Sequence, residues 1–151
     1  IYYDDINISV AASIDGVLMT PVIDKVNEKD IEEISDELNK IYGYLRKKKL
    51  MRVKMYGATF SVSNLGTFLI DDQHPFLNPP QAAIFGISRN RKLPVYNEND
   101  EIVPANLTLF SLTIDHGFAD GVNVAKYLTS VNKVLQDPWT YMYHKAAPKE
   151  D

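Results

Sequence analysis

The sequence predicts an α+β fold, in which a β-sheet is covered by helices. Strand-like runs outnumber helical runs, and turn residues typical of hairpins join several of the strands. Two further segments have apolar residues at helical spacing. With 151 residues, 45% of them hydrophobic, the chain has the size and composition of one globular domain with a core of its own. No internal repeat or linker interrupts it, so we expect a single domain over residues 1–151.

The first expected element is a strand over residues 6–14, where apolar and polar residues alternate. Asp15-Gly16 follows, a dipeptide favoured in two-residue hairpin turns, and residues 17–23 are expected to return as a second strand. Pro21 has no backbone N–H to donate to a neighbouring strand. The return strand is therefore expected to lie at an edge of the sheet or to lose its regular pairing at Pro21.

An amphipathic helix is expected after Asp30, because Asp30 and Glu33 have the spacing of a capping box. Its apolar positions recur at intervals of three and four residues: Ile31, Ile34, Leu38, Ile41 and Leu45. A basic cluster follows, formed by Arg46, Lys47, Lys48, Lys49, Arg52 and Lys54. We interpret this cluster as the solvated end of the helix, favourable for the helix dipole. A docking site for an acidic partner or a phosphate is the alternative.

The second half of the chain is expected to supply the rest of the sheet. A short strand is predicted over residues 59–63, and residues 82–88 are so continuously apolar that we place them centrally in the sheet. Between them, residues 71–80 form a loop rich in proline and polar groups. A polar hairpin over residues 89–105 leads to the last strand at residues 107–114. A second helix follows Asp120, with apolar positions at Val124, Leu128, Val131 and Leu135, and ends before Pro138.

Composition excludes several classes of site. The formal net charge of -4 argues against nucleic acid as a partner, because binding phosphates needs a basic face. The chain has no cysteine, which excludes disulfides and thiolate chemistry, and only His74 and His144 accompany His116, so no metal site is expected. No long apolar run or leader segment is visible, so neither a membrane span nor a signal peptide is expected.

Candidate chemistry centres on His116, at the junction between the last strand and the second helix. Gly117 and Gly121 leave the local backbone free to adopt positive φ, and Asp120 is placed to cap the helix. From the local pattern alone, a structural role for this histidine is favoured over a catalytic one. Ser63 precedes Asn64-Leu65-Gly66 and, on local pattern alone, is a turn residue, since it lacks the context of a nucleophile elbow.

Several stretches resemble the catalytic domain of the dihydrolipoyl acyltransferases of 2-oxo acid dehydrogenase complexes. Asp115-His116 with Asp120-Gly121 is similar to that family's D-H-R-x-x-D-G motif. The segments ATFSVSNLGTFLID and FLNPPQAAIFGIS resemble its G-T-F-T-I-S-N-L-G and I-I-N-P-P-Q-x-A-I-L-G-V segments, and IDGVLMTPVI and LQDPWTYM match further ones in the same order. Chloramphenicol acetyltransferase has a related histidine motif, but the S-N-L-G and N-P-P-Q segments favour the multienzyme complex.

The resemblance implies a chloramphenicol acetyltransferase-like fold, a mixed β-sheet covered by helices, that forms trimers. It implies transfer of an acyl group, with acetyl favoured, from the S-acyl-dihydrolipoyl arm to coenzyme A. His116 would be the general base, Ser63 would donate a hydrogen bond to the oxyanion, and Asp120 would orient the catalytic loop. Asn64, Gly66, Gly117 and Gly121 would support these loops.

The same resemblance implies partners. The active site would be a channel between subunits of a homotrimer, with His116 of one chain facing Ser63 of its neighbour. Trimers would assemble into a larger cage-like core that serves lipoyl domains, a decarboxylating dehydrogenase and dihydrolipoamide dehydrogenase. Four C-terminal residues would make contacts between trimers or pack onto the domain itself: Trp139, Tyr141, Met142 and Tyr143. The expected location is the cytoplasm of a prokaryote, or the mitochondrial matrix in a eukaryote, with the cytoplasm favoured.

Two departures from the family pattern leave alternatives open. Gly117 replaces the family's arginine, which removes a charge that braces the catalytic loop. The chain is also expected to lack the N-terminal portion of the catalytic domain and the lipoyl and peripheral-subunit-binding domains. A non-catalytic structural core, or a free-standing acetyltransferase that uses acetyl-coenzyme A, is the alternative function.

Overall fold

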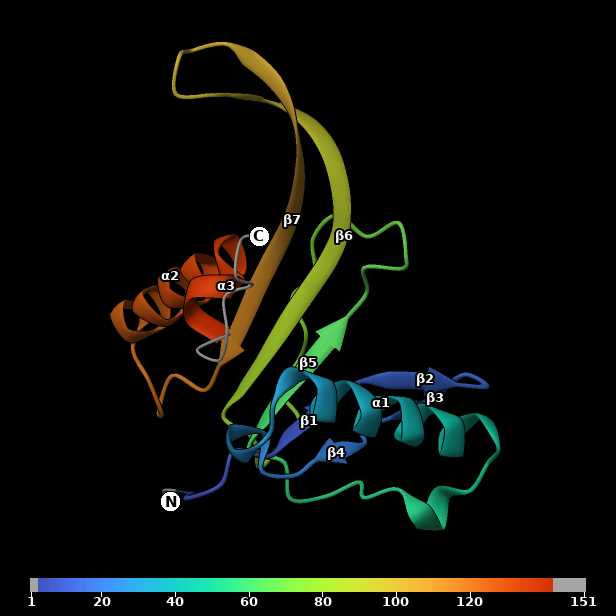
Figure 1. Ribbon diagram of the computed structural model, residues 1–151. Helices are drawn as coiled ribbons and strands as arrows, with labels where there is room; N and C mark the ends of the chain where they lie inside the picture. Colours follow the sequence, from blue (N-terminus) through green and yellow to red (C-terminus); the bar gives the residue numbers. More distant parts are fainter. Residues whose placement is uncertain (1–2, 143–151) are drawn as a thin grey trace, which may run out of the picture. The chain divides into compact units, whose positions relative to one another are not determined.

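The computed structural model describes residues 3–142 (Figure 1). The chain divides into two compact units, Ile1–Asp115 and His116–Asp151, which are described one at a time. No helix among residues 3–142 is both long enough and apolar enough to cross a membrane.

The first unit contains the strands and one long helix. Its elements are, in order, β1 (Ile8–Val10), β2 (Ala12–Ile14), β3 (Val17–Met19), β4 (Val22–Ile23), η1 (Val26–Glu28), α1 (Ile31–Arg46), η2 (Leu50–Arg52), β5 (Phe60–Asn64), β6 (Ala83–Tyr96) and β7 (Ile102–Ile114).

A five-stranded mixed sheet forms the frame of this unit, in the order β4-β1-β5-β6-β7. β1 and β5 pair in parallel, as do β5 and β6, whereas β4 and β7 pair antiparallel with their neighbours. The register sets Ser63 opposite Gly86, and Gly86 opposite Ser111. β6 and β7 continue as a long two-stranded hairpin, so the polar excursion over residues 89–105 is a hairpin as predicted (Figure 1).

The single strand expected over residues 6–14 was a wrong prediction. It is divided at Ala11 into β1, in the large sheet, and β2, which pairs only with β3 in a separate hairpin. Alternating polarity indicates which side chains share a face of the sheet, but it does not indicate which strands are paired. The break at Ala11 therefore could not be predicted from the pattern. The Asp15-Gly16 turn is confirmed, with φ of 51° and 77°, and Pro21 separates β3 from the edge strand β4.

The capping box of α1 is confirmed in both directions. The Asp30 carboxylate accepts from the Glu33 backbone N–H at 2.8 Å, and the Glu33 carboxylate accepts from the Asp30 N–H at 3.0 Å. One face of α1 contributes to the buried core of this unit, which consists of Ile23, Ile41, Leu45 and Val53. Leu45 is fully buried, and burying a leucine side chain stabilises a fold by about 1.5–3 kcal/mol. Ile31, in the first turn, is 45% exposed and adds little to this core.

The basic cluster lies at the C-terminal end of α1, as the helix-end interpretation predicts. Arg46 is in the last turn and Lys47 is the C-cap residue. Some of its charge is neutralised locally, because Lys48 pairs with Asp15 at 2.8 Å and Lys54 pairs with Asp24 at 2.7 Å. The alternative, a docking site, remains a prediction.

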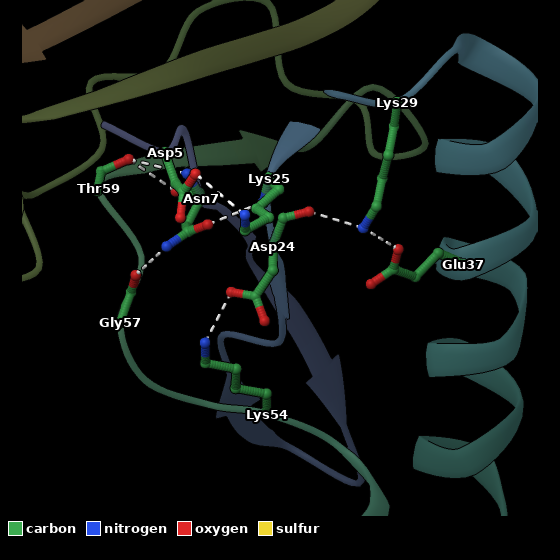
Figure 2. A network of polar contacts seen from close by, with 9 residues as sticks. All are labelled: Asp5, Asn7, Asp24, Lys25, Lys29, Glu37, Lys54, Gly57 and Thr59. Atoms are coloured by element: carbon green, nitrogen blue, oxygen red, sulfur yellow. Dashed lines mark hydrogen bonds and ion pairs between the residues drawn. The ribbon is translucent and has the colours of Figure 1, made fainter. Parts of the chain in front are cut away.

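A network of polar contacts joins the start of β1, the chain after β4, the segment before β5 and the helix α1 (Figure 2). The Asn7 side chain donates to the Gly57 carbonyl at 3.1 Å, and the Asn7 carbonyl accepts from the Thr59 hydroxyl at 3.1 Å. The Lys29 ammonium group bridges the Asp24 carbonyl and the Glu37 carboxylate, at 2.6 and 2.5 Å. The contacts of Asn7 thus hold the chain that enters β5, the strand that carries Ser63.

The second unit contains α2 (Gly121–Gln136) and α3 (Pro138–Met142). Asp120 is the N-cap of α2, as predicted, and its carboxylate accepts from the Asn123 N–H at 2.8 Å. Val124, Leu128 and Val131 are half-buried, as expected. In the last turn the half-buried apolar residue is Val134, whereas the predicted Leu135 is 50% exposed.

Candidate functional site

Ser63 lies on β5, in the middle of the large sheet, and lines a pocket of about 480 Å³. Strand alternation places Ser61 and Ser63 on the same face, and both line this pocket. The rest of its wall comes from neighbouring strands and from the loop before β6: Ala11, Leu18, Thr20, Pro75, Phe76, Leu77, Asn78 and Ile84. The pocket is therefore mostly apolar, with two serine hydroxyls on one wall.

Gln73 is the polar residue that holds Ser63. The Ser63 hydroxyl donates to the Gln73 Oε1 at 3.3 Å. The Gln73 Nε2 donates to the Ser63 carbonyl at 3.2 Å and to the Ile87 carbonyl at 2.6 Å. The Ser111 hydroxyl donates to the Gln73 carbonyl at 2.5 Å, and Gln73 is only 9% exposed. This buried amide thus links β5 and β6 beside the pocket, and Ser111 links its backbone to β7.

Gln81, at the end of the N-P-P-Q segment, forms a second buried polar cluster with Ser9 and Ser61. The Ser61 hydroxyl donates to the Gln81 Oε1, the Gln81 Nε2 donates to the Ser9 hydroxyl at 3.4 Å, and the two hydroxyls lie 2.6 Å apart. Ser9 and Ser61 are 1% and 2% exposed. A closed ring of hydrogen bonds satisfies all three side chains and ties this segment to β1 and β5.

The predicted support residues Asn64 and Gly66 form a tight turn after β5. The Asn64 Oδ1 accepts from the Gly66 N–H at 2.8 Å, and a Cβ on Gly66 would lie only 2.9 Å from that oxygen. Gly66 thus allows the close approach of the Asn64 amide oxygen, and it does so without a positive φ. The Leu65 N–H donates to the Ile87 carbonyl at 2.9 Å, which holds the turn against β6.

The segment after this turn is held by ion pairs. Asp71 pairs with Arg89 through Nε and with Arg91 through Nη1 at 3.1 Å, and the Arg89 N–H donates to the Ile70 carbonyl at 3.0 Å. The hydrogen bond from Arg89 is the main cause that holds the pKa of Asp71 below its usual range. Both arginines lie on β6, so this strand holds Ile70 and Asp71 through Arg89 and Arg91, in addition to holding Leu65 through Ile87.

The remaining predicted site residues belong to the second unit. His116 is exposed and directly precedes Gly117 in the turn before α2. Asp120 acts as the helix cap. Gly121 does not adopt the positive φ that a glycine at this position would allow. Gly121 is simply the first residue of α2, with open space around a built Cβ.

The structure therefore groups Ser63, Asn64 and Gly66 in the first unit, and His116, Gly117, Asp120 and Gly121 in the second. Trp139 and Tyr141, on α3, are 62% and 49% exposed. Of the other two C-terminal candidates, the Met142 side chain and Tyr143 lie outside the described part of the chain. Within residues 3–142, no three histidine or carboxylate side chains cluster closely enough to hold a metal ion.

Sequence reasoning missed Gln73 and Gln81. Both lie in or beside a loop rich in proline and polar residues, where a glutamine is ordinarily solvated. Gln81 is part of the N-P-P-Q segment, which was one indication of a role, whereas Gln73 lies outside every segment that carries the resemblance.

Comparisons with known proteins bear on this geometry. The family model described as 2-oxoacid dehydrogenases acyltransferase (catalytic domain) matches residues 1–143. The dihydrolipoyllysine-residue acetyltransferase component of the pyruvate dehydrogenase complex from Rickettsia conorii is 33% identical over 137 residues, which is 91% of this chain and 33% of that protein. This chain thus spans about a third of the length of that curated relative.

Two solved structures share the fold. One comes from crystallographic and enzymatic work on a serine, a histidine and an asparagine in the catalytic mechanism of Azotobacter vinelandii dihydrolipoamide acetyltransferase. It is 28% identical, with a TM-score of 0.85, over 93% of this chain and 57% of that one. The other is the cubic core of the pyruvate dehydrogenase multienzyme complex, 28% identical with a TM-score of 0.85 over 91% and 56%.

These matches confirm the predicted α+β, chloramphenicol acetyltransferase-like fold. The chain belongs to the family of 2-oxoacid dehydrogenase acyltransferase catalytic domains.

Proposed function

We propose that this chain is the catalytic domain of a dihydrolipoyllysine-residue acyltransferase, which transfers an acetyl group from an S-acetyldihydrolipoyl arm to coenzyme A. The observation that carries the proposal is the Ser63 hydroxyl in the wall of a mostly apolar pocket, in a chain that also keeps the family's histidine motif. The Rickettsia conorii relative is named as an acetyltransferase component, which supports acetyl as the acyl group.

The chemistry follows from what a thiol needs in order to attack a thioester. A thiol is mostly protonated at neutral pH, so His116 takes the proton of the coenzyme A thiol as the thiolate attacks the acetyl carbonyl. The tetrahedral intermediate carries a negative oxygen, to which the Ser63 hydroxyl donates a hydrogen bond. When the intermediate collapses, the carbon–sulfur bond to the dihydrolipoyl arm breaks. The leaving thiolate takes the proton back from His116, so the base is regenerated.

The Azotobacter vinelandii relative supports these assignments. Its mechanism was investigated at a serine, a histidine and an asparagine, and the histidine and asparagine stand four positions apart. His116 and Asp120 have the same separation here, with aspartate in place of asparagine. We assign Asp120 to the orientation of the catalytic turn, in addition to its role as the helix cap.

We further propose a homotrimer in which His116 of one chain faces Ser63 of the next, so that an isolated monomer is inactive. The similarity to the cubic core of a pyruvate dehydrogenase complex supports assembly of such trimers into a larger core. Trp139 and Tyr141 are 62% and 49% exposed, which supports a place for them in contacts between trimers. The partners of the core are then lipoyl domains, a decarboxylating dehydrogenase and dihydrolipoamide dehydrogenase.

The domain assignment is part of the same proposal. A family model that matches residues 1–143 supports one acyltransferase domain to which both compact units belong, with the lipoyl group on a separate domain. The named relative is bacterial, which supports a cytoplasmic location.

Two alternatives compete with this function. A structural core without turnover is suggested by Gly117, where the family has an arginine, and a free-standing acetyltransferase is suggested by the histidine motif shared with chloramphenicol acetyltransferase. The deciding experiment is an assay of the full-length protein for acetyl transfer between acetyl-coenzyme A and dihydrolipoamide, together with its assembly mass. Transfer by a particle much larger than a trimer supports the proposal. A large but inactive particle supports the structural core, and an active trimer that uses a small hydroxyl acceptor supports the free-standing enzyme.

A further inference from the structure

We infer that Gln73 is a positioning residue for Ser63, which aims the serine hydroxyl and thereby sets the turnover of acyl transfer. This inference rests on the proposed role of Ser63 as the oxyanion donor. It assigns a function to a residue that the histidine and serine motifs do not include.

The orientation of the Gln73 amide is fixed by its nitrogen. Nε2 has two N–H groups, and they donate to the carbonyls of Ser63 and Ile87. If the amide flipped, its oxygen would face two carbonyl oxygens and its nitrogen would face the serine hydroxyl. The two carbonyls therefore hold Oε1 toward the Ser63 hydroxyl, where it accepts the only proton that this hydroxyl has.

The hydrogen bond from Ser63 to Gln73 is long enough to be exchanged. Its oxygen–oxygen distance is 3.3 Å, whereas a strong O–H···O bond is about 2.7–2.8 Å. A developing oxyanion is a charged acceptor, and hydrogen bonds to charged acceptors are roughly twice as strong as neutral ones. Gln73 thus restricts the rotation of the hydroxyl in the resting enzyme. When the oxyanion forms, the hydroxyl can donate its hydrogen bond to the oxyanion instead of to Gln73.

The surroundings hold Gln73 rigidly in this place. Ser111 donates to its backbone carbonyl from β7. Gly86 leaves the space that its side chain needs, because a Cβ there would lie 3.1 Å from the Gln73 Cγ. Three strands of the sheet therefore determine the position of one amide beside Ser63.

The neutral charge of this amide matters as well. A carboxylate at the same place would bind the serine proton more strongly and would repel the oxyanion. It would also lack the N–H groups that satisfy the carbonyls of Ser63 and Ile87. Glutamine is thus the side chain that offers a weak acceptor to the hydroxyl and two donors to the strands.

The test is a double-mutant cycle in the full-length, assembled protein, with kcat and KM measured for acetyl-coenzyme A and dihydrolipoamide. Ser63→Ala is expected to lower kcat by about 10² to 10³, as for the loss of an oxyanion donor. Gln73→Met removes both the acceptor and the donors at similar volume, and a fraction of that effect is expected, about tenfold in kcat with little change in KM. In the Ser63→Ala background the same change is expected to have no further effect.

Gln81→Met provides the matched control, because it removes a second buried glutamine that bonds Ser9 and Ser61 rather than Ser63. Gln81→Met is expected to lower kcat by the same factor in the wild-type and Ser63→Ala backgrounds. If Gln73→Met also lowers kcat by the same factor in both backgrounds, its role is merely structural and the inference is overturned. Wild-type kcat in Gln73→Met would overturn it too.

Failure of the underlying function is a different outcome. If Ser63→Ala leaves kcat unchanged, Ser63 is not the oxyanion donor, and the inference fails together with that role. If Gln73→Met does not assemble, Gln73→Glu takes its place in the cycle. We expect a larger loss of kcat for Gln73→Glu than for Gln73→Met. The loss is expected to shrink as the pH falls and the new carboxyl is protonated, and to be absent in the Ser63→Ala background.

Discussion

Gly86 and Ser111 face each other across β6 and β7, and the Ser111 hydroxyl occupies the space that a side chain on Gly86 would need. A Cβ built on Gly86 would lie 2.4 Å from the Ser111 Oγ and 3.1 Å from the Pro75 Cδ. The absent side chain lets the loop before β6 pack on the strands beside the pocket.

Gly86→Ala is therefore expected to destabilise the fold. Overpacking of this kind costs about 1–3 kcal/mol, and it is expected to lower the urea midpoint without a change in the m-value. Gly43→Ala is the control, because no atom other than the backbone of α1 and the adjacent residues lies within 4 Å of a Cβ there, and alanine favours the interior of α1. An equal loss of stability in the two variants would contradict the assigned role of Gly86.

The capping box of α1 gives a second prediction. Asp30→Ala leaves the Glu33 N–H without its partner, and the loss of an N-cap typically costs about 1 kcal/mol. Asp36→Ala, on the exposed side of the same helix, removes a carboxylate but no cap. Urea unfolding is expected to show a clear loss for Asp30→Ala and almost none for Asp36→Ala. Similar losses in both would indicate a general charge effect instead of a cap.

Local patterns predicted what depends on local chemistry. The Asp15-Gly16 turn, the box formed by Asp30 and Glu33, and the Asp120 cap all depend on residues a few positions apart, and each is present. The break of the first strand at Ala11 depends on pairing with other strands, since β1 pairs with β5 and β2 pairs with β3. The alternation of apolar and polar residues does not identify these partners.

The same limit applies to the candidate site. Ser63 and His116 were found through motifs, but the residue that holds Ser63 was not, because Gln73 is ten positions away in a polar loop. Its inward orientation results from Gly86 and Ser111, which are far from it in sequence and reach it only through strand register. Contacts of this kind appear only when the sheet has been assembled.

The ion pair of Asp71 predicts a weakening of the fold in acid. Arg89 lowers the pKa of Asp71 in the folded state, so the unfolded state binds more protons between the two pKa values. The contribution of Asp71 to stability is thus complete above the usual aspartate range and is lost as the pH falls through the lowered pKa. Because Asp71 is exposed, the effect is expected to be small. Asp71→Asn is expected to lower the Tm at pH 6, and this difference is expected to shrink as the pH falls through the lowered pKa of Asp71. A Tm difference that persists unchanged in acid would contradict the ion pair.

The proposed channel between subunits predicts complementation between two inactive variants. His116→Ala is expected to lower turnover by about 10² to 10⁴ with assembly intact, whereas His74→Ala, at an exposed histidine beside Asp72, is expected to keep normal turnover.

When His116→Ala and Ser63→Ala chains are co-expressed, a site between chains can combine His116 from one variant with Ser63 from the other. With random 1:1 mixing in a trimer, about a quarter of the sites are expected to be intact, so activity reappears in the mixed assembly. Separately expressed variants that are mixed without subunit exchange provide the control. If a confirmed mixed trimer stays as inactive as its parents, both residues act within one chain, and the proposed arrangement is wrong.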